Sequence, residues 1–385
     1  MRYLLGTCFV VGCIYIIVYS YGCADGTSSD QLRINLRWIK SFPNEKKENV
    51  ITGIKWNLSF LGAMLPKGSF KKAVRWKNET TFILDLSKVG FDQPAETALI
   101  QFLKVIKESQ EYQKFDAIDL GRFIMLMFNS PHHYYAITGA NEKFSSFSAR
   151  FVFEDKKAAI IESSIAVGNR LIEISRAEKF SEIAFVGLEG EGSVEEGTFE
   201  IREFEAMDFM PNGQLRFALY DSKGNLESAT TPSMTAAGKP AKCLWCHELG
   251  FVPPFEDDHT LLGYYSSVDF KNILMDRRET VLEYRKELNS EIDFTDLQAH
   301  TQAELLYLAF MEPSAERLAQ EWGLSVSETQ KRLQGFETHP QHEFKYLGDH
   351  LYYRHDIDSM APYENIVVSD DAREYSAYEP DFIRH

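Results

Sequence analysis

The fold is decided by Thr198-Phe-Glu-Ile-Arg-Glu-Phe204 and Gln214-Leu-Arg-Phe-Ala-Leu-Tyr220, which flank the turn Pro211-Asn-Gly213. Both segments alternate apolar and polar residues, which is the period of a half-buried strand. A glycine-containing turn between two such runs indicates a hairpin. The pair therefore predicts the centre of an antiparallel sheet.

Further strands are predicted before this hairpin. The same reasoning applies to residues 54–60, 80–86, 147–153, 158–161, 170–174 and 183–186. The glycine-rich stretch Gly187-Leu-Glu-Gly-Glu-Gly192 predicts a loop, because its acidic residues would repel a phosphate and no Lys-Ser/Thr pair follows.

Helical periodicity dominates elsewhere. Helices are predicted where apolar residues recur every three or four residues, or fill the whole segment, at residues 94–106, 119–128, 270–288 and 295–311. Residues 315–336 predict two short helices, with Ser325 as the N-cap of the second. Residues 345–353 predict a late strand. The chain is thus predicted to be α+β, with a largely antiparallel sheet and flanking helices.

The N-terminus has the pattern of an export signal. Met1-Arg2 precedes an uncharged apolar run that ends at Gly22-Cys23. Ser20-Tyr-Gly-Cys23 resembles a bacterial lipobox, which implies removal of residues 1–22 and a lipid anchor on Cys23. A retained transmembrane anchor and a plain cleaved signal are the alternatives. All three place the remaining chain outside the cytoplasm.

The most specific motif is Cys243-Leu-Trp-Cys-His247. C-x-x-C-H is typical of covalent haem c attachment, in which two thiols form thioethers with the porphyrin and the histidine becomes the proximal iron ligand. The other three cysteines lie within the first 23 residues, so the rest of the chain has no disulfide framework. One haem c is expected, on Cys243, Cys246 and His247.

Three other interpretations of this motif remain open: a thiol-disulfide site, a zinc site and a chance pentapeptide. The sixth iron position is also open. The candidate ligands, in order, are Met311, Met360 and His259, with Met275 and His300 as further downstream candidates. An empty sixth position is the alternative. Upstream, Met207, Met210 and Met234 are interpreted as core or exposed residues.

Other histidines are interpreted as structural or surface residues. His132 and His133 are expected on opposite faces of a strand, where they could not share a metal ion. His339, His342, His350 and His355 match no known metal-site spacing. The formal net charge of −16 argues against binding to nucleic acid or to an anionic lipid surface.

The motif gives residues 236–312 a resemblance to a monohaem cytochrome c domain. The order of the segments, with the sheet first, then the small-residue linker 228–240 and then C-x-x-C-H, is similar to the cytochrome P460 and cytochrome c′-beta proteins. This resemblance implies an open or reactive distal side of the haem.

These patterns divide the chain into a signal (1–22), a tether (23–50), an α+β domain of unknown role (51–235), the haem-binding segment (236–312) and a helical and irregular C-terminal region (313–385). The expected function is one-electron transfer to an unidentified redox partner. The alternatives are a haem enzyme or gas-binding protein with an open distal site, and a surface binding or assembly lipoprotein with an accessory haem segment.

Overall fold

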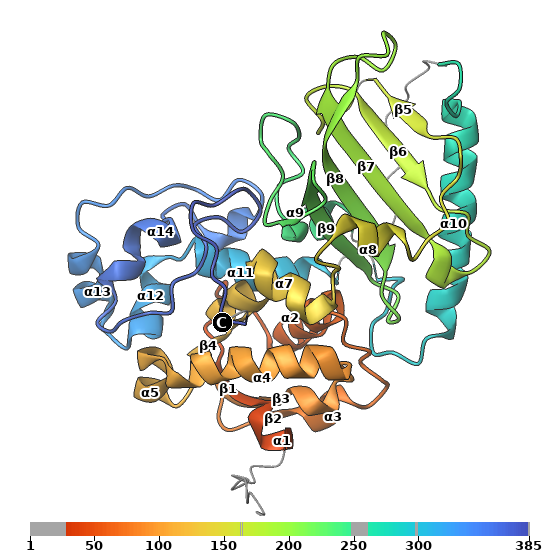
Figure 1. The fold of residues 1–385 in the computed structure, drawn as a ribbon. Helices are drawn as coiled ribbons and strands as arrows, with labels where there is room; N and C mark the ends of the chain where they lie inside the picture. The colour runs from red at the N-terminus through yellow and green to blue at the C-terminus, as the bar shows by residue number, and fades with distance from the viewer. Residues whose placement is uncertain (1–27, 162, 164, 248–260, 297–298, 384–385) are drawn as a thin grey trace, which may run out of the picture.

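A computed structural model describes residues 28–383 except 162, 164, 248–260 and 297–298. The predicted signal, Cys23 and His259 lie outside these residues. The described chain has an α+β fold with two sheets, each accompanied by helices (Figure 1). The predicted fold class is confirmed.

The first sheet has the strand order β2-β3-β1-β4. Its members are β1 (Arg33–Arg37), β2 (Val74–Trp76), β3 (Thr81–Asp85) and β4 (Ile118–Asp119). β1 pairs antiparallel with β3 and parallel with β4. Residues 23–50 were predicted as a tether, and this is wrong for β1, because Ile34 and Leu36 alternate with polar residues and are buried in the core.

Helices surround this first sheet. They are α1 (Ser28–Gln31), α2 (Lys47–Phe60), α3 (Phe70–Ala73), the 3-10 turn η1 (Leu86–Lys88), α4 (Gln93–Glu108), α5 (Gln110–Phe115), α6 (Leu120–Ile124), the π-helical turn η2 (Met125–Asn129) and α7 (Pro131–Thr138). The helix predicted from residue 94 is confirmed as α4, which Asp92 caps by accepting a hydrogen bond from the Ala95 N–H.

The strand predicted at residues 54–60 is wrong, because this segment is the C-terminal half of α2. Val50, Ile54 and Leu58 recur every four residues and are buried, as on the inner face of a helix. The Asn57 amide donates to the carbonyl oxygens of Gly53 and Ala303, which ties α2 to a C-terminal helix.

The second sheet is an antiparallel meander in the order β10-β9-β8-β7-β6-β5. Its strands are β5 (Ala158–Ile160), β6 (Arg170–Ile174), β7 (Ala184–Glu191), β8 (Glu200–Phe209), β9 (Leu215–Asp221) and β10 (Leu226–Glu227). The deciding hairpin is confirmed as β8–β9. Gly213 has a φ of +84° in its turn, a conformation that favours glycine.

Two predictions within this region are wrong. Residues 147–153 were predicted as a strand, but the chain forms α8 (Phe144–Ser148) and then an irregular segment. The loop predicted at residues 187–192 lies mostly within β7. Glycine is required there for close strand packing, since a Cβ on Gly190 would lie 2.2 Å from the Glu200 carbonyl oxygen.

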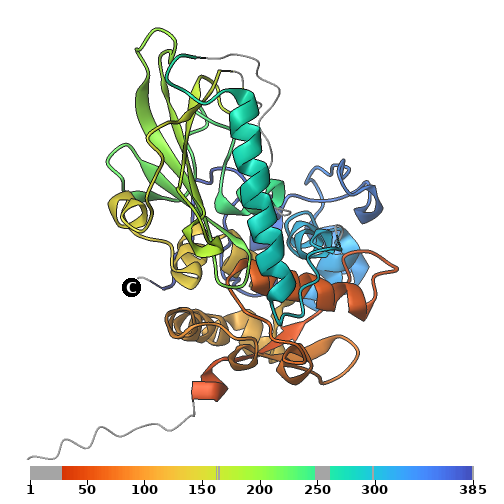
Figure 2. The same ribbon diagram turned by 90° about the vertical axis from the view of Figure 1, so that its right-hand side faces the viewer.

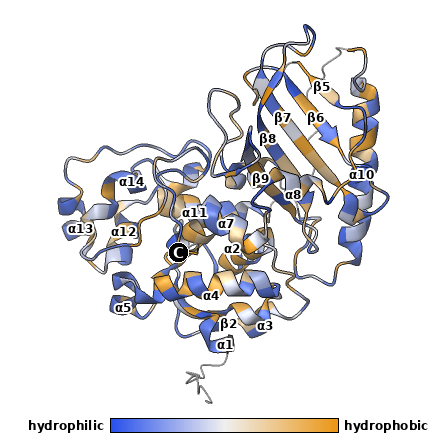
Figure 3. Ribbon diagram, viewed as in Figure 1, coloured by the Kyte–Doolittle hydropathy of each residue, from blue (hydrophilic) through white to orange (hydrophobic). Residues whose placement is uncertain are grey.

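One face of the second sheet is crossed by α10 (Ser267–Glu287), as Figure 2 shows. The 3-10 turn η3 (Phe180–Glu182) anchors α10 to the sheet, because the rings of Phe180 and Tyr284 stack with centroids 3.7 Å apart. Short α9 (Pro240–Cys246) packs against β9. Hydrophobic residues fill the first half of β7 (Figure 3). The predicted helix 270–288 is confirmed.

The C-terminal elements pack against the first sheet and its helices, rather than forming an extension (Figure 1). They are α11 (Thr301–Met311), α12 (Ala315–Trp322), α13 (Val326–Arg332), η4 (Lys345–Leu347), α14 (Arg354–Ile357) and η5 (Asp358–Met360). Ser325 caps α13, as predicted. The strand predicted at 345–353 is wrong, because only Leu351 makes isolated bridges there.

Among the described residues, no helix is long and apolar enough to cross a membrane.

Candidate haem site

The C-x-x-C-H motif lies on α9 and immediately after it. Pro240 occupies the first turn, where its missing N–H costs nothing. Cys243 and Cys246 are three residues apart, which places their side chains on one face of the helix. The helix ends at His247, whose N–H donates to the Cys243 carbonyl oxygen at 2.9 Å. Local helical geometry therefore brings both sulfurs and the imidazole to one side.

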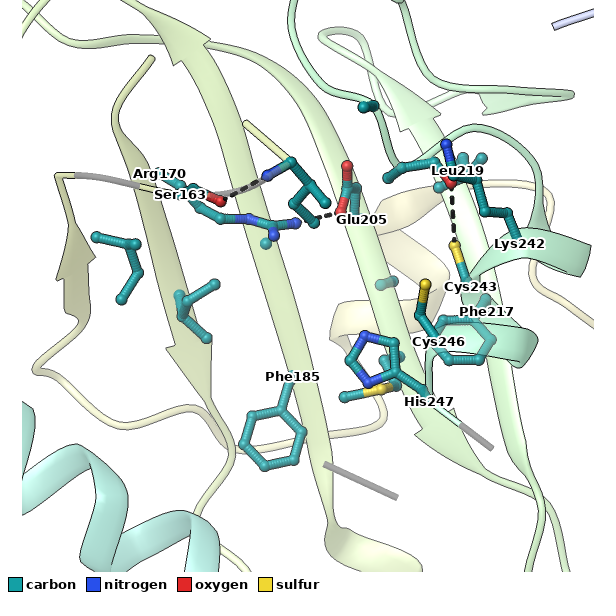
Figure 4. Close-up of a pocket in the computed structure, with 18 of the residues that line it drawn as sticks. Ser163, Arg170, Phe185, Glu205, Phe217, Leu219, Lys242, Cys243, Cys246 and His247 are labelled. Atoms are coloured by element: carbon teal, nitrogen blue, oxygen red, sulfur yellow. Dashed lines mark hydrogen bonds and ion pairs between the residues drawn. The ribbon is translucent and has the colours of Figure 1, made fainter. Parts of the chain in front are cut away.

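These three side chains line a cavity of about 420 Å³ between α9, α10 and the second sheet (Figure 4). The sheet contributes the floor, and Phe270 and Leu274 of α10 contribute an apolar wall. The other lining residues are Ile160, Ser163, Ile165, Arg170, Ile172, Phe185, Gly187, Glu205, Ala206, Met207, Phe217, Leu219, Ala236, Ala237 and Lys242. The cavity is thus mainly apolar, with the charged pair Arg170 and Glu205 in its floor and Lys242 in its wall.

The register of the sheet decides which strand residues face this cavity. Phe185 and Phe217 both pair directly with Met207, from β7 and β9 respectively, so the three share one face. The Phe217 ring contacts the His247 imidazole with centroids 5.6 Å apart. Met207 therefore lies in the cavity next to Phe217. It was interpreted from the sequence as a core or exposed residue, and its position in the cavity was missed.

The outer side of α9 is held by the C-terminal segment of the chain. The Lys239 N–H donates to the Arg373 carbonyl oxygen at 2.7 Å, and the buried Lys239 ammonium lies 2.5 Å from a carboxylate oxygen of Glu379. The Arg373 guanidinium lies 4.4 Å from the centroid of the Trp245 ring. These contacts tie the helix that carries the motif to the C-terminal segment of the chain.

The environment of Cys243 does not favour a thiol-disulfide site. Burial raises the pKa of the Cys243 thiol, which donates to the Ala237 carbonyl oxygen at 3.8 Å. Reactive cysteines instead have a lowered pKa, often at a helix N-terminus. Here Cys243 lies at the middle of α9 and Cys246 is its last residue, so neither thiol is at the helix N-terminus.

A zinc site also lacks support. Among the described residues, no three His, Cys, Asp or Glu side chains are grouped so that they could hold a metal ion. A structural zinc site needs four such ligands.

A cluster of charged residues at the cavity floor is formed by Arg170, Glu189 and Glu205, which come from three adjacent strands. The Arg170 guanidinium of β6 forms an ion pair with Glu205 of β8, which Figure 4 shows, and a second with Glu189 of β7. Gly187 makes this crossing possible, because a Cβ there would lie 2.8 Å from Arg170 Nη2. Burial raises the pKa of Glu189 to about 8, although its pairing with Arg170 opposes this shift.

None of the described downstream candidates for the sixth ligand lines the cavity. Met311 is buried at the end of α11, and Met360 packs against a separate cluster that contains Trp322. Met275 is 63% exposed on α10. His300 is buried behind α9, with its ring 6.2 Å from that of Trp56.

The histidine pair at 132–133 lies on helix α7, so the predicted strand is wrong there. His133 is buried and structural, as predicted. Its Nδ1 is 2.7 Å from the Leu126 carbonyl oxygen, and its Nε2 accepts from the Phe382 N–H at 2.9 Å.

Sequence reasoning missed Arg170, Gly187 and Glu205 as site residues. The signal that could have revealed Glu205 is the register of β8. Once the β8–β9 turn is fixed, alternate residues of β8 share one face, which places Glu205 on the same face as Met207 and Phe209. A charged residue in an inward series is unusual and indicates a functional or paired group.

No protein family profile, characterised protein or solved structure matches the chain.

Proposed function

We propose that the chain is an exported c-type haem protein with its single haem in the cavity between the second sheet, α9 and α10. The observation that supports this most strongly is that Cys243, Cys246 and His247 line one mainly apolar cavity. The two cysteines would hold the haem through thioethers, and His247 would be its proximal ligand. Such a haem supplies an iron that can exchange single electrons or bind small ligands.

The cavity suits this cofactor in size and chemistry. Its volume of about 420 Å³ falls within the roughly 300–1,000 Å³ typical of ligand and cofactor sites. Phe185, Phe217, Phe270 and Leu274 supply the apolar walls that would exclude water from a porphyrin. Both cysteines and the histidine come from one short segment, as covalent attachment requires.

An open sixth iron position is favoured over simple electron transfer. Among the described residues, Met311, Met360, Met275 and His300 lie away from the cavity, as described above; His259 lies outside the described residues. With no described candidate side chain at the sixth position, the iron of the proposed haem would be open to a small molecule. We therefore infer binding or redox conversion of a small molecule as the leading function.

One-electron transfer remains the second candidate, because Cys246 is exposed. The attachment edge of the haem would then lie close to solvent, where a redox partner protein could approach it. In this case the cavity would serve only to shield the porphyrin.

The proposed location follows from the chemistry of haem attachment and the N-terminal sequence. In bacteria, c-type haem is attached outside the cytoplasm, so the chain must be exported. Residues 1–22 resemble a lipoprotein signal, and Cys23 would carry the lipid that holds the protein at a membrane. The periplasmic or cell-surface side of a bacterial membrane is the proposed location.

The test is a haem stain of denatured protein, with a pyridine haemochrome spectrum, after expression of the full chain with the cytochrome c maturation machinery. We expect a stained band with a c-type spectrum, because thioether bonds survive denaturation. The double variant Cys243→Ala/Cys246→Ala should lose the band completely.

Cys23→Ser is the matched control, since it removes a cysteine outside the motif. It should abolish lipid labelling and membrane association while the haem stain remains. If wild-type protein that has been exported correctly carries no covalent haem, the proposal is wrong, and the two cysteines must be tested as a redox or metal pair.

A further inference from the structure

A carboxylate oxygen without a hydrogen-bond partner lies in the cavity floor. Glu205 Oε2 accepts from Arg170, whereas Glu205 Oε1 is buried and has no hydrogen-bond partner within the described chain. The side chain as a whole is only 13% exposed. A buried acceptor of this kind is costly unless a donor reaches it. The cavity therefore favours an occupant with an N–H or O–H group.

The positive charge of Arg170 is already neutralised by its neighbours. Its Nε faces Glu189 and its Nη2 faces Glu205, and the side chain of Glu189 is only 1% exposed. Burial raises the pKa of Glu189, and its pairing with Arg170 opposes that shift. With a carboxyl group against each side of the guanidinium, Arg170 presents no uncompensated positive charge to the cavity.

The other cation in the cavity wall is neutralised in the same way. The Lys242 ammonium forms an ion pair with Glu374 of the C-terminal segment. An anion entering the cavity would therefore meet no uncompensated positive side chain among its described lining residues, and it would approach the carboxylate of Glu205.

We propose that the Arg170–Glu189–Glu205 cluster makes the cavity select small uncharged molecules that carry an N–H or O–H donor, and reject anions. This inference rests on the proposed haem site, since the haem iron would be the reporter and the second anchor of such a molecule. Glu205 is the residue that determines the specificity, because it supplies both the acceptor and the negative charge.

The test uses full-length protein whose covalent haem has first been verified by the haem stain. Azide, an anion, and imidazole, which carries an N–H donor, are titrated into the ferric protein at pH 7 and followed by the optical spectrum. We expect Glu205→Gln to bind azide about tenfold more tightly than wild type, because one negative charge is removed from a poorly solvated wall. Imidazole affinity should change by less than about threefold.

Glu191→Gln is the matched control, because Glu191 is exposed on β7 and pairs with Arg202 outside the cavity. It should leave azide affinity unchanged. Arg170→Gln is the second variant, with the opposite sign: it should weaken azide binding about tenfold, and it keeps the proposal testable if Glu205→Gln does not fold.

The proposal is overturned if azide affinity is unchanged in both cavity variants, or if Glu191→Gln raises it as much as Glu205→Gln does. The second result would assign the effect to the overall negative charge of the protein. Failure of the haem site itself would already be visible in the preceding stain, so the two failures are distinguishable.

Discussion

Met207 and Phe217 are direct neighbours on β8 and β9, and this pairing bears on how the proposed haem would be held. The Phe217 ring contacts the His247 imidazole, and Met207 lines the same cavity. Met207 is the only methionine among the described cavity residues. Because it packs beside a ring that contacts His247, which would be the proximal ligand of the proposed haem, it would be poorly placed to serve as the sixth ligand.

At the residue scale we predict that Met207→Leu leaves the coordination of the iron unchanged. Leucine has a similar volume and keeps the apolar wall intact. The optical spectrum should remain high-spin, and carbon monoxide should bind the ferrous protein as it does in wild type. Met275→Leu, at an exposed position on α10, is the control. A conversion from a low-spin wild type to a high-spin variant would instead identify Met207 as a ligand.

The sequence was sufficient to single out Cys243, Cys246 and His247 as a candidate site, because the motif depends on local spacing alone, and the structure places all three side chains in one cavity. It was not sufficient to find the ion pair of Arg170 and Glu205, which are 35 residues apart. Their contact depends on the register of two hairpins and on the missing side chain of Gly187, and neither is visible in a local pattern. The apolar stretch at residues 250–255, which follows the motif in the sequence, lies outside the described residues.

At the scale of elements, the second sheet was largely predictable because its strands alternate and are separated by turn residues. α2 was not predictable in the same way. It packs closely against α11, and its C-terminal half is buried on nearly all sides, so its apolar residues are not confined to one helical stripe. Over residues 54–60 they match the strand period by coincidence. β1 was missed because it is short and lies within an otherwise polar segment.

The contact between α2 and α11 depends on Gly53. A Cβ at this position would lie 2.5 Å from the Gln302 carbonyl oxygen and 2.9 Å from Leu306 Cδ1. Alanine gains roughly 1 kcal/mol in helix propensity over glycine, but forcing the two helices apart costs about 1–3 kcal/mol or more. We expect Gly53→Ala to lower the free energy of unfolding, because part of the contact is backbone and cannot move aside.

Urea denaturation of Gly53→Ala checks this prediction. Gly168→Ala is the control, since a Cβ there would lie 3.6 Å from its nearest neighbour, the Gly190 carbonyl oxygen. That variant should unfold within about 0.5 kcal/mol of wild type. An increase in stability for Gly53→Ala would mean that α2 and α11 can separate without loss.

At the scale of the whole molecule, a buried network of charges joins the N-terminal and C-terminal parts of the chain. Arg317 binds Asp119 at 2.9 Å across 198 residues, and Arg122 binds Asp358 at 2.7 Å across 236 residues. No sequence pattern reports pairs at such separations. The predicted division into an α+β domain and a C-terminal region therefore does not describe the packing, because the C-terminal helices pack against the first sheet and its helices.

Glu321 is the centre of this network. Its two carboxylate oxygens each lie 2.9 Å from a guanidinium nitrogen of Arg354, and Arg317 Nη1 is 2.7 Å from Oε2. Burial alone would raise the pKa of Glu321, but Arg354, Arg317 and Arg122 outweigh burial and lower it to about 2. Because this value lies below 4.5, the ordinary value for glutamate, the stabilisation is complete above about pH 4.5 and is lost as the pH falls toward 2.

We therefore predict that Glu321→Gln lowers the free energy of unfolding by about 3–5 kcal/mol at pH 7, since it leaves buried guanidinium groups without their carboxylate. The difference from wild type should narrow as the pH falls from 4.5 toward 2, because wild-type Glu321 then becomes neutral as well. Urea denaturation across this pH range measures both effects, with the exposed Glu316→Gln on the same helix as control. A loss below about 1 kcal/mol at pH 7, or one that does not change with pH, would show that the network does not hold the two parts of the chain together.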